Sequence, residues 1–254
     1  MNAPKVGSHP SGVSSTQGRL SAERAHGAAI KDHASEIWGW SKPSGQRRFV
    51  RRAAMLADAM KHARRVLEFG AGTGDFSRVL AAKAPCYVVI DISHDLLLKG
   101  RADGAFAEAH IIEGDLHRLP FRKGVFDHVC GSSVLHHLEA DKALNEAWRV
   151  LKNSGDIAFS EPNLANPQNA VVKRSAYLKS KVGDTPHETA FYRGQMIRLL
   201  RAAGFSGIAV TFYDFLYPFI PDACLDMAES CGRAIERIPL IKSISGSLWI
   251  TAIK

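Results

Sequence analysis

Short apolar runs and helical apolar stripes alternate along most of this 254-residue chain. Runs rich in β-branched and aromatic residues lie at 66–69, 87–90, 110–112, 125–130, 156–160, 207–212 and 247–253. Most of them lack the polar alternation of a half-exposed strand, which is typical of strands that are buried on both faces. Helical segments or turns separate the runs. This order predicts an α/β fold with a mostly parallel sheet that is covered by helices on both faces.

Three helical segments have a clear apolar face. The first begins near residue 44, after a turn at 38–43, and places four side chains on one stripe: Phe49, Ala53, Leu56 and Met60. The second covers 141–151, and the third covers 186–203 and stops at Gly204. Thr185 and Glu188 are spaced as a capping box at the start of the third segment, so we favour helix capping over catalysis for Glu188.

Composition narrows the class of protein. Hydrophobic residues make up 46% and charged residues 23% of the chain, as in folded globular proteins. No stretch approaches the roughly 20 apolar residues of a membrane span, and the N-terminus lacks the apolar core of a secretory signal, so we expect a cytoplasmic protein. Residues 1–20 are rich in Ser, Gly and Pro and are expected to be disordered. The four cysteines show no metal or disulfide spacing and are expected to be reduced thiols.

The net charge of +8 is concentrated in one segment. Residues 42–65 contain eight basic residues and one acid, which is a local charge of +7. A second basic run lies between Lys173 and Lys181. Such runs are usually solvated helix faces, and that interpretation is preferred here. The alternative is an anionic partner, such as a phosphate-bearing acceptor or a membrane surface.

A glycine-rich loop follows the first predicted strand. The chain there reads Glu68-Phe69-Gly70-Ala71-Gly72-Thr73-Gly74-Asp75, and a helix is expected to begin near Asp75. Glycines allow a tight turn and let a ligand approach the backbone. The spacing is G-x-G-x-G, which differs from the G-x-G-x-x-G fingerprint of dinucleotide-binding proteins. By itself the loop also fits a simple turn between a strand and a helix.

Acidic residues follow the next two predicted strands. Asp91, followed by Ile92, ends the second strand and lies 19 residues after Gly72, where a carboxylate can accept hydrogen bonds from the ribose of a nucleoside. Asp115 and Leu116 follow the third strand. Two further motifs, at 126–138 and 149–156, surround the fourth strand and precede the fifth.

These five motifs, in this order, make residues 65–161 similar to the class I S-adenosylmethionine-dependent methyltransferases, especially the subgroup with quinone-biosynthesis and natural-product enzymes. The resemblance implies a Rossmann-like fold with a mostly parallel seven-stranded sheet, helices on both faces and an antiparallel C-terminal strand. It also implies a single domain at 21–254, with an N-terminal helical cap at 21–62, a cofactor-binding core at 63–161 and an acceptor-side insertion with the C-terminal strands at 162–254. The sequence Asn153-Ser154-Gly155 departs from the Pro-Gly-Gly that is common in the family and affects only a turn.

The resemblance also assigns cofactor-binding residues for S-adenosylmethionine, which would leave as S-adenosylhomocysteine. The glycine loop would surround the methionine part, Asp91 would hold the ribose, and Asp115 with Leu116 would meet the adenine. Ser132 and Ser133 would line the side of methyl transfer. The full predicted set is Glu68, Gly70, Ala71, Gly72, Gly74, Asp91, Ile92, Asp115, Leu116, Ser132 and Ser133.

His136 and His137 are the candidate catalytic residues, because they follow the fourth strand and a histidine is a good base near neutral pH. His137 matches the family pattern slightly better. A histidine pair at this position also occurs in members that do not use it as a base. No metal is expected, because the methyl carbon of a sulfonium donor is already electrophilic.

The acceptor side is predicted from the residues added around the core. Candidate acceptor-binding residues are Glu161, Asn163, Tyr213, Asp214 and Tyr217. For the aromatic stretch at 212–221, ordinary core or a dimer contact is an equally good interpretation. Aromatic and basic residues together would suit an acceptor with a hydrophobic body and an anionic head, such as a lipid-linked precursor. The apolar stretch at 238–244 suggests contact with an anionic membrane surface at the inner membrane.

The preferred function is O- or C-methylation of a small-molecule or lipid-like acceptor. A nicotinamide-dependent oxidoreductase is disfavoured by the glycine spacing and by Asp115. An RNA methyltransferase is suggested only by the basic charge, and nucleic acid is an unlikely partner because no RNA-binding motif is present. A binding protein that retains the pocket without turnover is the third alternative.

Overall fold

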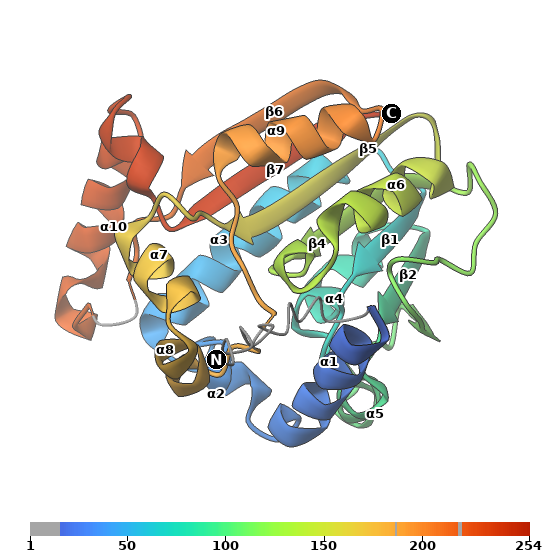
Figure 1. Cartoon of the computed structure of the whole chain (residues 1–254), viewed down its shortest axis with the longest axis horizontal. Helices are drawn as coiled ribbons and strands as arrows, with labels where there is room; N and C mark the ends of the chain where they lie inside the picture. Colours follow the sequence, from blue (N-terminus) through green and yellow to red (C-terminus); the bar gives the residue numbers. More distant parts are fainter. Residues whose placement is uncertain (1–15, 186, 218–219) are drawn as a thin grey trace, which may run out of the picture.

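The computed structural model describes residues 16–185, 187–217 and 220–254 (Figure 1). Its strands are β1 (Arg65–Phe69), β2 (Cys86–Asp91), β3 (His110–Glu113), β4 (Phe126–Ser132), β5 (Leu151–Pro162), β6 (Ser206–Tyr213) and β7 (Ser247–Ile253). Its α-helices are α1 (Thr16–Ile30), α2 (Ala34–Ile37), α3 (Pro43–Ala59), α4 (Asp75–Leu80), α5 (His94–Ala102), α6 (Ala140–Val150), α7 (Pro167–Arg174), α8 (Ala176–Val182), α9 (Arg193–Ala202) and α10 (Leu225–Ile235). Each predicted strand is present.

The strands form one sheet in the order β3-β2-β1-β4-β5-β7-β6. Strands β1 to β5 pair in parallel, whereas β7 is antiparallel to both β5 and β6. The predicted Rossmann-like sheet with an antiparallel C-terminal strand is confirmed. Because the parallel strands all end at one edge of the sheet, the loops that follow β1, β2, β3 and β4 meet there.

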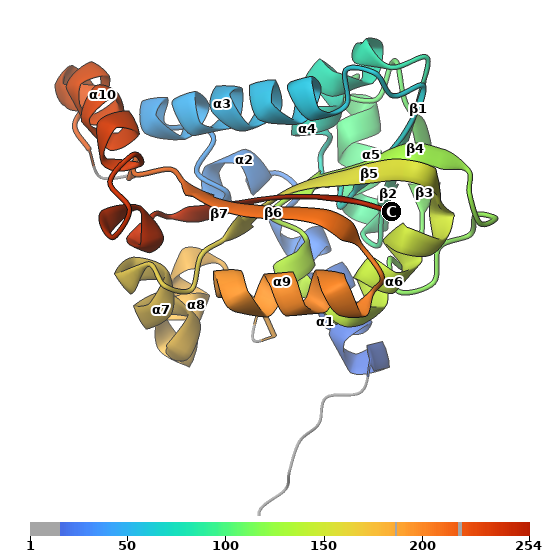
Figure 2. The ribbon, with the colours of Figure 1, turned by 90° about the horizontal axis from the view of Figure 1, so that it is seen from above.

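Two apolar layers hold helices against the sheet, one on each face. Helices α3, α4 and α5 bury Leu56, Leu80 and Leu97 against β1 and β2. Helices α6 and α9 bury Leu144 and Leu200 against the other face. Figure 2 shows α3 and α4 on one side of the sheet and α6 and α9 on the other. The apolar stripes of the sequence therefore become the two cores, and burying each leucine stabilises the fold by about 1.5–3 kcal/mol.

The N-terminal segment differs from its prediction. Disorder was expected over residues 1–20, but helix α1 begins at Thr16, and residues 1–15 lie outside the described part of the chain. Helix α1 packs against α5, and a Cβ atom on Gly27 would lie 2.1 Å from Ser93 Oγ. The predicted N-terminal helical cap therefore starts earlier than residue 21, and close packing on α5 stabilises this helix.

The helix expected at 186–203 begins only at Arg193. Upstream of it, the backbone makes bonds to other elements: Thr189 N donates to His136 O, and Phe191 N donates to Pro162 O. The capping-box bond from Thr185 N to Glu188 Oε1 does form, at 2.6 Å, but no helix follows it directly. The capping-box bond of Glu188 therefore does not start a helix at this point, because hydrogen bonds to the loop after β4 and to β5 hold the residues before Arg193.

The basic face of α3 is paired within the chain. Arg47 Nη1 lies 2.6 Å from Asp226 Oδ1 and 3.0 Å from Glu229 Oε2, and Arg51 makes two bonds of 2.7 Å to Glu236. These acids lie on or directly after α10. The excess of positive charge on α3 is thus largely offset by acids about 180 residues further along, while the Arg47 side chain stays 38% exposed as expected for a solvated face.

Two further arginines of α3 contact the same buried carboxylate. Arg48 Nε donates to Asp214 Oδ2 at 2.7 Å, and Arg52 Nη2 lies 3.5 Å from the same oxygen. The Arg52 side chain is 6% exposed and also donates to Ser133 Oγ and Ser247 Oγ. This network connects α3 to the ends of β4, β6 and β7. Among the described residues no helix is long and apolar enough to cross a membrane.

Candidate functional site

A cavity of about 950 Å³ lies at the carboxyl ends of the parallel strands. It is lined by the loops after β1, β2, β3 and β4, and by α1 together with the turn at 38–40. The predicted cofactor residues that line it are Gly70, Ala71, Gly72, Asp91, Ile92, Asp115, Leu116, Ser132 and Ser133. A second depression between α3 and α10 contains none of these residues. The structure therefore gathers most of the predicted cofactor set around one cavity.

The glycine loop requires residues without side chains. Gly70 has φ +67° and Gly72 has φ +54°, which L-residues rarely adopt. A Cβ atom on Gly72 would lie 2.7 Å from the Trp38 ring, and one on Gly70 would lie 2.4 Å from the Val134 side chain. The loop backbone is thus packed closely between its neighbours and still reaches the cavity wall.

Asp91 connects the second strand to the glycine loop. Its Oδ2 accepts from Gly72 N at 2.8 Å and its Oδ1 accepts from Ser93 N at 2.8 Å. Burial raises the pKa of Asp91, although these two backbone bonds oppose the shift. A carboxylate has about four acceptor positions, so capacity for ligand hydroxyls remains.

Asp115 is oriented by a neighbouring ring. Its Oδ1 accepts from the backbone N of His117 at 2.9 Å and lies 2.7 Å from His117 Nδ1. His117 Nε2 accepts from Glu139 N at 3.0 Å, so the ring carries its proton on Nδ1 and donates it to Asp115. The carboxylate is thereby fixed at the cavity wall.

The end of β4 contributes one hydroxyl with no partner. Ser132 Oγ is buried without a hydrogen bond among the described residues. Ser133, which follows it, has φ +57° and accepts from Arg52 Nη1 at 3.2 Å. Buried polar atoms are usually bonded, so an unpartnered hydroxyl and a left-handed residue at a cavity wall are features of a ligand-binding position.

Two predicted cofactor residues lie outside the cavity lining. Glu68 accepts from Ser77 Oγ at 2.6 Å and from Tyr87 Oη at 3.0 Å. Gly74 precedes α4, and a Cβ atom there would lie 2.6 Å from the Phe106 ring. Both residues support the glycine loop on the side away from the cavity, because their contacts connect α4 to β1, β2 and the segment after α5.

Burial raises the pKa of Glu68 to about 7. The folded state therefore holds the proton more tightly than the unfolded chain, so the stability contributed by this group is full at acidic pH and is lost as the pH rises through 7. We expect a loss of about 3 kcal/mol in the free energy of unfolding between pH 5 and pH 8 from this residue. Urea denaturation at both pH values should show that Glu68→Gln reduces the loss, whereas the exposed Glu108→Gln should leave it unchanged. An unaltered pH slope in Glu68→Gln would contradict the assignment.

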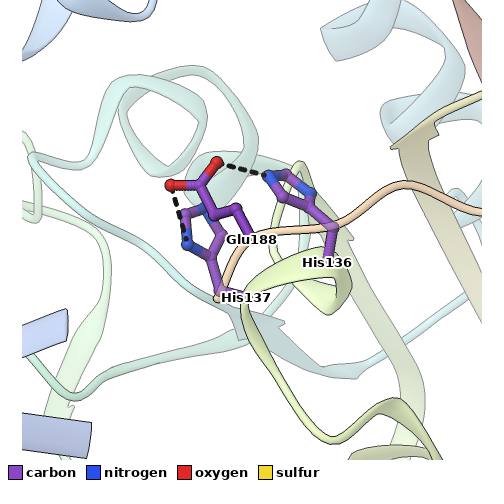
Figure 3. A group of neighbouring side chains, drawn as sticks. All are labelled: His136, His137 and Glu188. Carbon is purple, nitrogen blue, oxygen red and sulfur yellow. Dashed lines mark ion pairs between the residues drawn. The ribbon is translucent and has the colours of Figure 1, made fainter. Parts of the chain in front are cut away.

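The two histidines line the cavity together with Glu23 and Glu188, which sequence reasoning did not place there. Figure 3 shows Glu188 beside the two rings. His136 Nδ1 lies 2.8 Å from Glu161 Oε2, and Glu161 Oε1 accepts from the backbone N of Val134 and Leu135. His137 Nδ1 lies 3.1 Å from Glu23 Oε2. Glu188 extends between the rings, 3.7 Å from His136 Nε2 and 3.5 Å from His137 Nδ1.

The surroundings of the two rings favour opposite protonation states. Burial and the charge of His137 lower the pKa of His136, although Glu161 opposes this shift. Burial also lowers the pKa of His137, but the carboxylates of Glu23 and Glu188 outweigh burial and raise it to about 9. These shifts favour a neutral His136 and a protonated His137 near neutral pH.

The predicted acceptor residues do not line the cavity. Asn163 donates to the carbonyls of Ser243 and Ser245, and Asn166 Nδ2 donates to Tyr217 Oη. The remaining members bind neighbouring elements: Tyr213 contacts Ser160, Asp214 pairs with Arg48 and Arg52, and Glu161 lies behind His136. These side chains join the β5, β6 and β7 ends to the insertion and to α3. Their polar atoms are engaged within the chain, which local sequence cannot reveal.

Residues that sequence reasoning did not assign to the site also line the cavity. Trp38, Trp40, Arg48 and Arg52 line it from one side, and Lys173 lines it from the insertion. The Arg52 guanidinium lies 5.5 Å from the centre of the Trp40 ring. In the sequence, the tryptophans belong to the predicted turn at 38–43 and the arginines to the basic segment at 42–65. Only packing of α3 across the sheet edge brings them to the cavity.

A protein-family model described as a methyltransferase domain matches residues 67–159. This segment begins in β1 and ends in β5, and it contains the glycine loop, Asp91, Asp115 and the histidine pair.

Curated relatives and a solved structure show the same similarity. The chain is 28% identical over 193 residues to a ubiquinone/menaquinone biosynthesis C-methyltransferase of Vibrio parahaemolyticus, covering 70% of this chain and 73% of that enzyme. It is 29% identical over 173 residues to a malonyl-[acyl-carrier protein] O-methyltransferase of Geobacter sulfurreducens, covering 65% of this chain and 64% of that enzyme. A Thermotoga maritima crystal structure, an S-adenosylmethionine-dependent methyltransferase described as a possible histamine N-methyltransferase, matches with a TM-score of 0.67 at 17% identity and covers 90% of this chain and 99% of that one. The last likeness establishes the fold.

Proposed function

Because this chain carries the methyltransferase domain of the class I S-adenosylmethionine-dependent enzymes, we propose that it methylates a small-molecule or lipid-like acceptor by in-line displacement. The observation that carries the proposal is the bond of Asp91 to Gly72 N, since it holds a buried carboxylate and a bare backbone loop at one wall of the cavity. The curated relatives are named as C- and O-methyltransferases, which supports oxygen or carbon as the atom methylated.

We assign each part of the cofactor to one motif of the cavity wall. Asp91 would accept from the ribose hydroxyls, and Asp115 with Leu116 would meet the adenine. The backbone of the glycine loop and the unpartnered Ser132 hydroxyl would hold the amino-acid part. When bound, S-adenosylmethionine supplies a methyl carbon that is already electrophilic. The protein then has to hold the acceptor atom in line and about 3–3.5 Å away, which lowers the barrier by several kcal/mol.

The acceptor end of the cavity combines aromatic and cationic groups. Trp40, Arg48 and Arg52 lie there, and one carboxylate, that of Asp214, is shared by both arginines. This arrangement favours an acceptor with an apolar body and an anionic group. We retain this acceptor class as part of the proposal.

Contact with an anionic membrane surface would suit a lipid-like acceptor. Leu240, Ile241 and Ile244 are exposed on the turn before β7, and Leu240 is 86% exposed. Lys242 lies within the same turn. An apolar group beside a cation is the composition expected of a peripheral membrane contact.

Calorimetry with S-adenosylhomocysteine and NAD, followed by transfer from a methyl-labelled donor, tests the proposed function. We expect S-adenosylhomocysteine to bind and NAD not to bind. The label should enter a quinol, phenol or lipid-linked acceptor presented in micelles or anionic liposomes, and it should not enter RNA. Co-sedimentation with the same liposomes at low salt examines the membrane contact. Binding of NAD instead of S-adenosylhomocysteine would reject the methyltransferase proposal, and labelled RNA would reject the acceptor class.

A further inference from the structure

We propose that His136, His137 and Glu188, together with Glu23, form a binding site for one divalent transition-metal cation at the acceptor end of the cavity (Figure 3). The ligand atoms of His136, His137 and Glu188 all lie within 4.8 Å of one another. The site differs from the sequence expectation that no metal takes part. That expectation considered the methyl donor, whereas this cluster lies where the acceptor is proposed to bind.

Three spacings between side-chain atoms, which involve both oxygens of Glu188, are close to those between ligands of one cation. His136 Nε2 and His137 Nδ1 lie 3.7 and 3.5 Å from the Glu188 oxygens, and His137 Nδ1 lies 3.1 Å from Glu23 Oε2. Metal–ligand bonds of about 2.0–2.2 Å at tetrahedral angles place the ligand atoms roughly 3.3–3.6 Å apart. The observed spacings fall around this value.

The ring nitrogens that face the cluster have no hydrogen bond among the described residues. His137 Nδ1 is buried, and the atoms next to it are carboxylate oxygens in ion-pair contact, 3.1 Å away on Glu23 and 3.5 Å away on Glu188. His136 is 6% exposed, and its Nε2 is too far from Glu188, at 3.7 Å, for a hydrogen bond. Buried polar atoms without partners are uncommon. A cation coordinated by both nitrogens would satisfy both.

Outer contacts already orient each ligand. The Nδ1 of His136 is bonded to Glu161 at 2.8 Å, and two backbone N–H groups fix that carboxylate. A proton held on Nδ1 leaves the lone pair of Nε2 directed at the cluster, which is the carboxylate–histidine–metal arrangement. Glu188 Oε1 is anchored by Thr185 N, and Glu23 Oε1 by Thr185 Oγ1. One threonine therefore positions both carboxylates.

The local charge also favours a cation. Four carboxylates, those of Glu23, Glu161, Asp184 and Glu188, lie in and around the cluster, together with two ammonium groups, those of Lys173 and Lys179. Lys173 Nζ lies 3.0 Å from Glu188 Oε2 and 2.6 Å from Asp184 Oδ2. Asp184 can therefore retain the lysine while Glu188 binds the cation. A divalent cation that replaces the proton of His137 would offset the negative charge that remains.

Two imidazoles with carboxylates favour Zn²⁺, Co²⁺, Mn²⁺, Fe²⁺ or Ni²⁺ over Mg²⁺ and Ca²⁺, which take mainly oxygen ligands. His136, His137 and Glu188 all line the cavity, so a cation there would be reachable by a ligand. Its use in holding an acceptor oxygen rests on the proposed function. Binding of the metal itself does not.

Calorimetric titration of the chelator-treated full chain with Zn²⁺ tests the site, and Co²⁺ gives a visible absorption band that reports its ligands. We expect one cation per chain. His136→Gln and Glu188→Gln should each weaken binding at least 100-fold, and Glu161→Gln, which removes an outer contact, should weaken it about 10-fold. The matched control is His94→Gln, since His94 forms an exposed pair with Glu113 outside the cavity and should bind Zn²⁺ like the wild type.

Binding of S-adenosylhomocysteine by the same variants separates this inference from the proposed function and shows that each variant is folded. The metal proposal is overturned if the wild type binds no stoichiometric Zn²⁺, or if His136→Gln and His94→Gln bind it equally. Stoichiometric Zn²⁺ binding that depends on these residues, in a protein that fails to bind S-adenosylhomocysteine, would support the metal site and reject the methyltransferase proposal. Should Glu188→Gln fail to fold, His137→Gln replaces it with the same expected loss.

Discussion

Replacing Asp91 by asparagine is expected to weaken the binding of S-adenosylhomocysteine about 100-fold. The carboxylate accepts from Gly72 N and Ser93 N through different oxygens. Asparagine has only one acceptor oxygen, so its amide nitrogen would face one of these donors, and the proposed charged partner of the ribose would be lost. Hydrogen bonds to charged groups contribute about 1.5–3 kcal/mol each, and a loss of about 2.8 kcal/mol corresponds to a hundredfold weaker complex. Calorimetry measures the change directly.

Methylthioadenosine sharpens the measurement, because it has the ribose and adenine but lacks the amino-acid tail. It should lose about the same factor on Asp91→Asn. The control is Asp103→Asn, an exposed aspartate that pairs with Lys99 after α5, and it should bind both ligands normally. An unchanged dissociation constant for Asp91→Asn would refute the ribose assignment. A loss limited to S-adenosylhomocysteine would move the contact of Asp91 to the amino-acid part.

Asp214→Asn is expected to lower the free energy of unfolding by about 3–5 kcal/mol, the usual effect of removing one partner from a buried ion pair. The Asp214 side chain is 4% exposed, and the nearby guanidinium groups of Arg48 and Arg52 lower its pKa despite the opposing effect of burial. The variant would leave the Arg52 cation, which is 6% exposed, without its carboxylate. Asparagine also tolerates the φ of +77° at this position, so the change tests charge rather than backbone strain.

Urea denaturation of Asp214→Asn should be compared with that of Asp226→Asn. Asp226 pairs with Arg47 on the surface, and its side chain is 89% exposed. Exposed pairs contribute about 1 kcal/mol or less, so this control should unfold almost like the wild type. If both substitutions change the free energy of unfolding by the same small amount, Asp214 is not the group that neutralises the α3 arginines.

The cofactor half of the site could be predicted because its parts are close in the sequence. The glycine loop lies between β1 and α4, and Asp91 ends the next parallel strand, so the bond from Gly72 N to Asp91 crosses only 19 residues. In a sequence, a buried parallel strand is recognised by a run of apolar residues, and a tight turn is recognised by glycines. Both signals are local, and the strand order of this fold then brings the loop and the carboxylate together.

The rest of the cavity lining and its surroundings depend on contacts between distant elements. Arg48 meets Asp214 across 166 residues, and Thr185 meets Glu23 across 162. Glu188 has the local spacing of a cap, but its carboxylate lies beside the histidines because the backbone near it bonds to β5 and to the loop after β4. A sequence shows which residues are charged or polar, whereas the packing of distant elements determines which partner neutralises each charge. The amino-acid order therefore determined the sheet and the contact of the glycine loop with Asp91, and only the tertiary structure decided which acids and histidines lie together at the cavity.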